Sequence, residues 1–134
     1  MSEQDNLQTI QRAYKAFTER NLPTLLSSVS ADVEFFPPAM ARVPWAHPWR
    51  GRTEVEQYFR TLAAVLDFQE FEGDEFILSS DSVVVLGHER CLVRATGRVV
   101  EARWVQIFDF REGLICRHRE YTDTASWNAG FENA

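Results

Sequence analysis

The chain has 134 residues, 45% of them hydrophobic and 25% charged, which is the balance of a globular protein with one buried core. Its net charge of −6 argues against nucleic acid or an anionic membrane as the main partner. The N-terminal residues are polar and amphipathic, so we expect no signal peptide and no transmembrane segment. These properties predict a single cytoplasmic domain over residues 1–134.

The N-terminal part predicts two helices and a strand. Apolar residues recur at intervals of three and four between positions 5 and 20, which indicates an amphipathic helix. A shorter helix over residues 23–29 has proline in its first turn, and a strand over residues 33–36 follows. Tyr14 is the one residue of the first apolar stripe with a hydroxyl group, so we expect it to complete a pocket.

Residues 37–51 contain four prolines, which exclude a regular helix or a central strand. We predict that this segment is a flap over a pocket mouth, with Trp45, His47 and Trp49 in contact with a ligand. The alternative is a rigid loop whose tryptophans only cover the core.

A third helix and four strands complete the chain. Thr53 and Glu56 have the spacing of a capping box, and the helix that they begin carries Tyr58 on its apolar stripe. Strands are expected over residues 67–79, with a bulge at Gly73, over residues 82–94, and on either side of a turn at 111–113 within residues 99–123; a last helical turn follows Asp123.

The hairpin within residues 99–123 predicts a binding wall, because alternate side chains of a strand point to one face. Gln106, His118 and Glu120 share that face with apolar side chains, as is typical of a small-molecule pocket. The residues expected on it are Trp104, Gln106, Phe108, Phe110, Leu114, Cys116, His118 and Glu120.

The turn at residues 95–98 sets the register of the preceding strand. A four-residue loop places Gly87 opposite Gln106, where the missing side chain leaves room for a ligand. In this register Glu89 also points to the binding wall.

The ionisable residues of this wall predict acid–base chemistry. Buried carboxyl groups such as Glu89 and Glu120 titrate near neutral pH, and a histidine such as His118 does so without further adjustment. The alternative is an internal hydrogen-bonded group that only satisfies a polar patch of the core. Cys91 and Cys116 are expected to be unpaired core residues. The histidines lack the spacing of metal ligands, so we expect no metal and no cofactor.

The opposite face of the strands combines arginines with aliphatic residues, which favours a homodimer interface. The alternative is a solvated face on which arginine stems lie over aliphatic side chains. The residues expected on it are His88, Arg90, Arg94, Arg103, Arg117 and Arg119, with Val84, Leu86, Val105, Ile107 and Ile115.

Motifs along the whole chain follow a known order. They are Tyr14-Lys-Ala-Phe17, Gly51 before Val55 and Tyr58-Phe59, Asp81 before Val85, Gly97-Arg98, Trp104 to Phe108, Glu112-Gly113-Leu-Ile115 and Arg119-Glu-Tyr-Thr-Asp123. This order resembles the SnoaL-like branch of the nuclear transport factor 2-like (NTF2-like, or ketosteroid isomerase-like) superfamily. The resemblance implies a cone-shaped α+β fold, in which a curved antiparallel sheet wraps around N-terminal helices and an internal pocket, usually in a homodimer.

The resemblance also narrows the chemistry. Steroid isomerases of this fold carry an aspartate base at the position of Phe36, so we do not expect steroid isomerisation. Their oxyanion-binding residues correspond to Gln106 and Tyr14. Relatives that hydrolyse limonene epoxide need an arginine and an aspartate two residues apart, and Arg90 is followed at that spacing by Leu92.

We therefore expect a cofactor-independent isomerase, cyclase or hydrolase that acts on a small apolar cyclic or carbonyl compound. His118 and Glu120 would act as acid and base, while Gln106 and Tyr14 would donate hydrogen bonds to an oxyanion. The residues expected to contact the ligand are Trp45, His47, Trp49, Tyr58, Glu89, Trp104 and Phe108. Two alternatives are a binding or dimerisation module without turnover and a scaffold whose pocket is filled by side chains.

Overall fold

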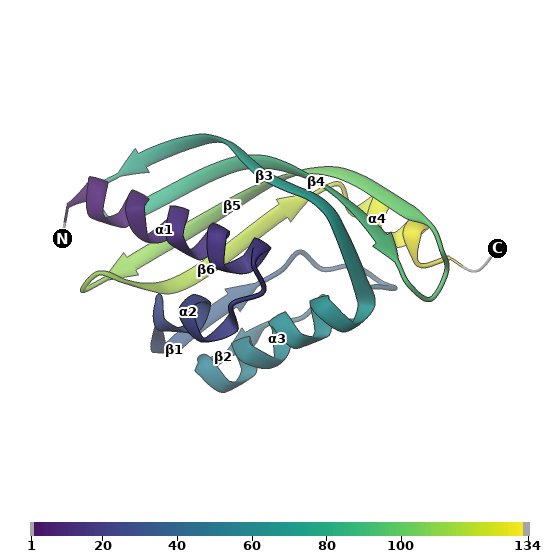
Figure 1. Ribbon diagram of the computed structural model, residues 1–134, viewed down its shortest axis with the longest axis horizontal. Coiled ribbons are helices and arrows are strands. Elements are labelled where there is room, and N and C mark those ends of the chain that lie inside the picture. The colour runs from purple at the N-terminus through teal and green to yellow at the C-terminus, as the bar shows by residue number, and fades with distance from the viewer. Residues whose placement is uncertain (1, 133–134) are drawn as a thin grey trace.

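Strands with alternating buried residues form one curved sheet in the computed structural model, which describes residues 2–132 (Figure 1). The strand order is β2-β1-β6-β5-β4-β3. β1 and β6 run parallel, and every other neighbouring pair is antiparallel. The strands are β1 (Val29–Phe36), β2 (Trp49–Arg50), β3 (Leu66–Ser79), β4 (Ser82–Val93), β5 (Val99–Arg111) and β6 (Leu114–Thr122).

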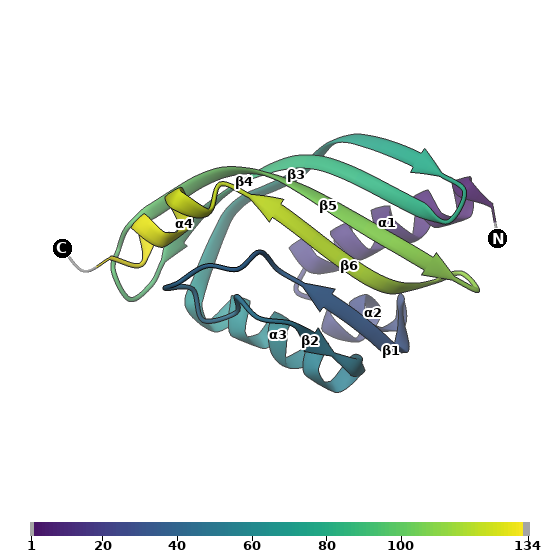
Figure 2. The ribbon, with the colours of Figure 1, turned by 180° about the vertical axis from the view of Figure 1, so that it is seen from behind.

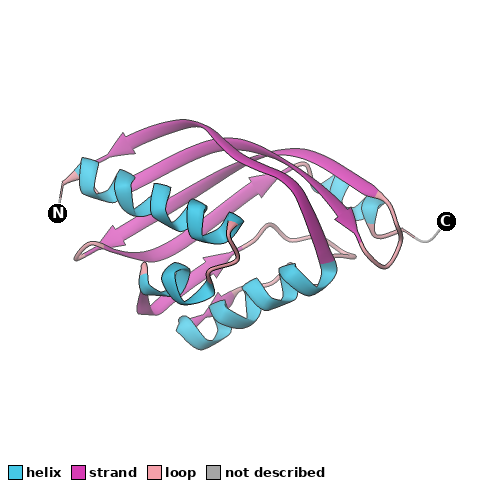
Figure 3. Cartoon of the chain, viewed as in Figure 1, coloured by secondary structure: helices cyan, strands magenta, loops and turns pink. Residues whose placement is uncertain are grey.

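The first three helices pack beside this sheet and leave its other face open (Figure 3). α1 contacts β3 and β4, whereas α3 contacts β1 and β2. The last helix lies at the far end of the sheet and packs against β5. The helices are α1 (Glu3–Thr18), α2 (Leu22–Ser27), α3 (Gly51–Val65) and α4 (Thr124–Gly130). This mixed α+β architecture is the fold class that the sequence predicted. None of the helices among residues 2–132 is long and apolar enough to cross a membrane.

Local hydrogen bonds explain where the helices begin. Ser2 and Asp5 form a capping box at the start of α1, and the Asp123 side chain caps α4 as expected. The predicted cap of α3 at Thr53 is wrong, because the helix begins two residues earlier. Its first backbone N–H group, that of Arg50, donates to Glu54 Oε1 at 2.8 Å, and Gly51 supplies the φ of +84° that the turn requires.

The register of β4 against β5 differs from the prediction by two residues. Leu92 pairs with Val99, so Gly87 lies opposite Trp104 and not opposite Gln106. The predicted four-residue loop was too short, because six residues, 93–98, lie between the last paired residues of the two strands. A shift of two residues keeps each side chain on its predicted face, so Glu89 still points to the inner face.

Because of the same shift, the prediction that Gly87 leaves room for a ligand is wrong. A Cβ atom at this position would lie 2.3 Å from the Trp104 ring, and also 2.3 Å from the Glu72 carbonyl oxygen. The glycine therefore makes room for the indole of Trp104 and leaves no space for a ligand.

A bulge between Asp109 and Phe110 shifts the register, so the first residues of β6 lie on other faces than predicted. Ile115 was expected on the outer face, but it is 2% exposed and points into the core. Cys116 was expected on the inner face; it is half-buried, and its thiol donates to the Asp109 carbonyl oxygen at 3.4 Å. The bulge expected at Gly73 is confirmed by a register shift between β3 and β4 at this residue.

Candidate functional site

An internal cavity of about 70 Å³ lies between the inner face of the sheet and the helices. Most of its wall is apolar, and ten of its lining residues are aromatic. The side chains that bring polar groups to it come from α1, the end of α2, α3 and three neighbouring strands. They are Tyr14, Ser28, Tyr58, Glu89, Gln106, His118 and Glu120.

Three of these side chains form a hydrogen-bonded chain from α1 across the sheet. The Tyr14 hydroxyl donates to Gln106 Oε1 at 2.6 Å, and Gln106 Nε2 donates to Glu120 Oε1 at 2.7 Å. Gln106 and Glu120 are direct cross-strand partners on β5 and β6. The Tyr14 ring is fixed by edge contacts with Phe71, Trp104 and Phe108. The chain thereby holds the Glu120 carboxyl group in one orientation.

Glu120 titrates near neutral pH. Burial in the apolar wall raises its pKa from the ordinary 4.5 to about 7, although the hydrogen bond from Gln106 acts in the opposite direction. At pH 7 both the acid and the carboxylate are therefore populated, as a general acid or base requires.

Glu89 is the second carboxyl group of the cavity and is only 7% exposed. Burial, and then the charge of Glu120, raise its pKa well above the ordinary value. The Cys91 thiol donates a hydrogen bond to its Oε1 at 3.9 Å. The raised pKa favours the protonated form of Glu89, which can donate a hydrogen bond into the cavity.

His118 lies between two aromatic rings and is 3% exposed. Its ring centroid is 4.4 Å from that of Phe35 and 4.9 Å from that of Phe108. Burial lowers its pKa from 6.5 to about 3, so the imidazole is neutral at physiological pH. Nδ1 has no hydrogen-bond partner among the described residues, which leaves this atom unpaired in the wall.

The residues predicted to contact a ligand divide into two groups. Trp45, Tyr58 and Phe108 line the cavity, as does Glu89. The other three, Trp104, Trp49 and His47, are not among its lining residues. Trp104 is stacked on Phe71 at 4.9 Å, Trp49 packs on Tyr58 at 5.7 Å, and His47 is exposed and lies 4.1 Å from the Trp49 ring.

The proline-rich segment between β1 and β2 reaches toward α4 before it returns to β2 (Figure 2). Trp45 is 3% exposed and contacts Trp127 at 5.4 Å, and the backbone N–H of Arg42 donates to Asn128 Oδ1 at 3.2 Å. The segment is thus anchored to the last helix and closes that end of the cavity with Trp45.

Sequence reasoning missed several parts of the wall. Phe35 of β1, Met40 of the proline-rich segment and Trp127 of α4 also line the cavity, and none of them was predicted to do so. A groove of about 480 Å³ outside the cavity, between the end of α1, α3 and β3, shares Phe17, Phe59 and other apolar side chains with it. The apolar stripes of α1 and α3 marked these phenylalanines as buried, but stripes do not show which buried residues surround an empty space.

None of the arginines predicted for the outer face of the sheet lines the cavity, and Arg94 lies in the loop after β4. Arg90, the arginine compared above with that of the epoxide hydrolases, lies on the outer face of β4, where it pairs with Glu101 and donates to Gln69 Oε1 at 2.9 Å. Its exposure on this face keeps it away from the internal cavity. Phe36 ends β1, and the Arg50 guanidinium lies 5.8 Å from its ring centroid, so no carboxyl group stands at the steroid isomerase base position.

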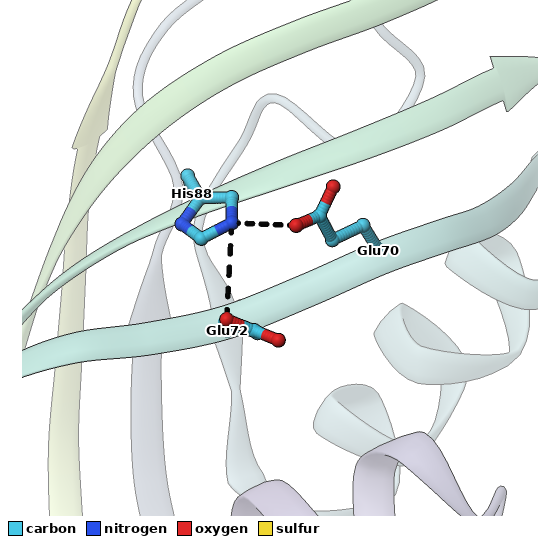
Figure 4. A group of neighbouring side chains, drawn as sticks. All are labelled: Glu70, Glu72 and His88. Atoms are coloured by element: carbon cyan, nitrogen blue, oxygen red, sulfur yellow. Dashed lines mark hydrogen bonds and ion pairs between the residues drawn. The ribbon is translucent and has the colours of Figure 1, made fainter.

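On the surface, Glu70, Glu72 and His88 form a cluster of residue types that can bind metal ions (Figure 4). Their spacing along the chain did not predict this cluster. His88 Nε2 lies 2.8 Å from Glu70 Oε1 and 4.0 Å from Glu72 Oε2, and His88 Nδ1 lies 2.7 Å from Asp74 Oδ2. Pairing of β3 with β4 brings these residues together. The carboxylates raise the pKa of His88 to about 9, so the group is a set of exposed ion pairs around an imidazolium.

Comparison with solved structures finds close relatives of the fold. An NTF2-like protein from Burkholderia xenovorans LB400 is 25% identical, with 98% of this chain and 99% of that chain covered and a TM-score of 0.90. An NTF2-like protein of unknown function from Burkholderia pseudomallei K96243 is 28% identical, with 98% of both chains covered and a TM-score of 0.88. TerC, co-crystallised with polyporic acid, is 24% identical, with 96% of this chain and 99% of that chain covered and a TM-score of 0.85.

Comparison of sequences gives the family. No curated protein sequence matches the chain. The family model of the SnoaL-like domain matches residues 10–118, which is most of the chain. The match includes most of α1, the helices α2 and α3, the proline-rich segment and the strands as far as His118, whereas Glu120 and α4 lie beyond it. The protein therefore belongs to the SnoaL-like domain family, within the NTF2-like superfamily.

Proposed function

We propose that the protein is a cofactor-independent enzyme that transfers protons to and from a small apolar compound, either cyclic or carbonyl-containing, in an isomerisation, cyclisation or hydrolysis. The observation that carries the proposal is Glu120: a carboxyl group inside an apolar cavity, held by Gln106 and titrating near pH 7.

In this proposal Glu120 is the general base. One of its oxygens accepts the hydrogen bond from Gln106, and the other takes a proton from the substrate. Glu89 and the neutral His118 offer hydrogen bonds to a substrate oxygen. Tyr14 acts through Gln106, because its hydroxyl proton is already donated to Oε1; the oxyanion role first expected for Tyr14 would require this bond to break.

A solvent-exchange screen tests the proposal without knowledge of the product. Small cyclic ketones and lactones are incubated with the protein in D₂O, and loss of the proton signals next to the carbonyl group is followed by NMR. We expect exchange with at least one compound, at a rate that falls by roughly 10²-fold or more in Glu120→Gln. Glu101→Gln makes the same chemical change on the outer face and should leave the rate unchanged. Equal exchange in wild type and Glu120→Gln would refute the role of Glu120.

A binding module without turnover is the second candidate. The observation that favours it is that Tyr14, Gln106 and Glu120 already satisfy one another. This candidate predicts that compounds raise the melting temperature, with no exchange or hydrolysis at any pH.

We also infer a homodimer through the outer face of the sheet. Leu86, Val105 and Tyr121 are register neighbours across β4, β5 and β6 on that face, and Tyr121 is 57% exposed. Analytical ultracentrifugation should give a dimer for the wild type and a monomer for Leu86→Glu. A wild type that sediments as a monomer at high micromolar concentration would exclude the interface.

A further inference from the structure

The cavity combines two carboxyl groups with an absence of positive charge. Glu89 and Glu120 both line it, and no lysine or arginine among the described residues does. The arginines that do form ion pairs pair with partly exposed carboxylates elsewhere, for example Arg111 with Asp32 and Arg117 with Asp109. Buried carboxyl groups are ordinarily paired, because an isolated buried charge is costly. The site therefore lacks a counter-ion of its own.

The rest of the wall suits a cation. Ring faces carry negative electrostatic potential, and a cation within about 6 Å of a ring centroid is attracted to it. Tyr14, Phe35, Tyr58 and Phe108 line the cavity together with the two carboxyl groups, and six further aromatic residues also belong to its wall. An anionic ligand would meet two carboxyl groups and no cationic partner.

The geometry points to a compact alkylammonium or cyclic ammonium ion as the ligand class of this cavity, with Glu89 and Glu120 as its counter-ions and the aromatic rings as its cage. The inference rests on the proposed function in that it uses the same cavity, and it names the substrate class more closely: the cyclic or carbonyl compound carries a protonated amine. The volume of about 70 Å³ requires the cationic group to be small.

The groups that face Glu120 allow it to ionise when a cation enters. They are Tyr14 from α1, Tyr58 from α3, Glu89 from β4, Gln106 from β5 and His118 on β6. None of them carries a positive charge near pH 7, because the pKa of His118 is lowered to about 3, so a bound ammonium would be the only opposite charge. Because the pKa of Glu120 is about 7, formation of its carboxylate needs little free energy at that pH.

A charge series of similar size tests the inference. Isothermal titration calorimetry at pH 7 compares tetramethylammonium chloride, neutral tert-butanol and anionic pivalate with the wild-type protein. We expect tetramethylammonium to bind at least tenfold more tightly than tert-butanol, and pivalate not to bind. Repetition in buffers of different ionisation enthalpy should show proton release with tetramethylammonium, because its charge is fixed and only the protein can lose the proton.

Variants identify the site. Glu120→Gln and Glu89→Gln should each weaken tetramethylammonium binding tenfold or more, whereas Glu101→Gln on the outer face should not. If tert-butanol binds as tightly as tetramethylammonium, or if only Glu101→Gln weakens the binding, the inference is overturned. The charge series needs only wild-type protein, so it decides the matter even if a variant fails to fold.

The two proposals fail separately. Absence of tetramethylammonium binding together with proton exchange on a neutral ketone would refute the ammonium class and leave the proposed enzyme in place. Tight tetramethylammonium binding with no exchange or hydrolysis of any amine-bearing or neutral compound would refute the enzyme and support the ammonium site.

Discussion

Gln106 Nε2 donates a 2.7 Å hydrogen bond to Glu120 Oε1 between the neighbouring strands β5 and β6. This bond lowers the pKa of Glu120, whereas burial raises it. We predict that Gln106→Leu raises the pKa of Glu120 further above 7, because the carboxylate loses the donor that stabilises it. The acidic limb of any pH–rate profile would move to higher pH by the same amount.

Carbon-13 NMR titration of the glutamate carboxyl signals measures this change directly. Tyr14→Phe is the matched control, since it keeps the Gln106–Glu120 bond and removes only the hydroxyl that orients Gln106. An unchanged Glu120 titration in Gln106→Leu would show that the hydrogen bond has no electrostatic role.

Glu120 also makes stability depend on pH. Its pKa is about 7 when folded and about 4.5 when unfolded, so the unfolded state releases the proton first as pH rises. The free energy of unfolding should therefore fall between pH 4.5 and 7 and then level off. The difference amounts to roughly 3 kcal/mol at about 1.4 kcal/mol per pH unit.

Glu120→Gln removes this dependence. Urea unfolding at several pH values should show the variant gaining stability relative to wild type as pH rises through this range. The opposing contribution of His118, whose neutral form is favoured in the fold, is present in both proteins and cancels in the difference. Parallel stability curves for the two proteins would contradict the prediction.

Gly87 should tolerate no side chain. We predict that Gly87→Ala lowers the free energy of unfolding by several kcal/mol, because its Cβ would lie 2.3 Å from both the Trp104 ring and a backbone oxygen. Gly97→Ala is the control: it meets no atom within 4 Å but has a φ of +74°, so only backbone strain of about 1 kcal/mol is expected. Equal losses measured by urea unfolding would mean that the Trp104 contact does not matter.

His88 should be an imidazolium at neutral pH. Hydrogen bonds to Asp74 and Glu70 raise its pKa to about 9, so its contribution to stability is complete below 6.5 and is lost as pH rises through 9. Proton NMR of the imidazole signals should give this midpoint, and Asp74→Asn should lower it. A midpoint near 6.5 in the wild type would show that these exposed contacts do not persist in solution.

The sequence by itself determined the fold class, most elements and the inner face of β5. These features depend on local patterns: apolar spacing defined α1, Asp123 capped α4, and alternation along β5 placed Gln106 and Phe108 together. The same alternation placed His118 and Glu120 on that face of β6. The common face of these side chains could be predicted because β4, β5 and β6 are neighbours in the sequence as well as in the sheet.

Only the tertiary structure decided what surrounds the cavity and how its charges behave. The bulge at Asp109 turned Ile115 inward, and the longer loop placed Gly87 against Trp104 instead of beside a ligand. The grouping of His88 with Glu70 depends equally on the register of β3 against β4. Register and bulges are set by packing across the whole sheet, and burial alone moved the pKa of His118 to about 3, so neither can be read from neighbours along the chain.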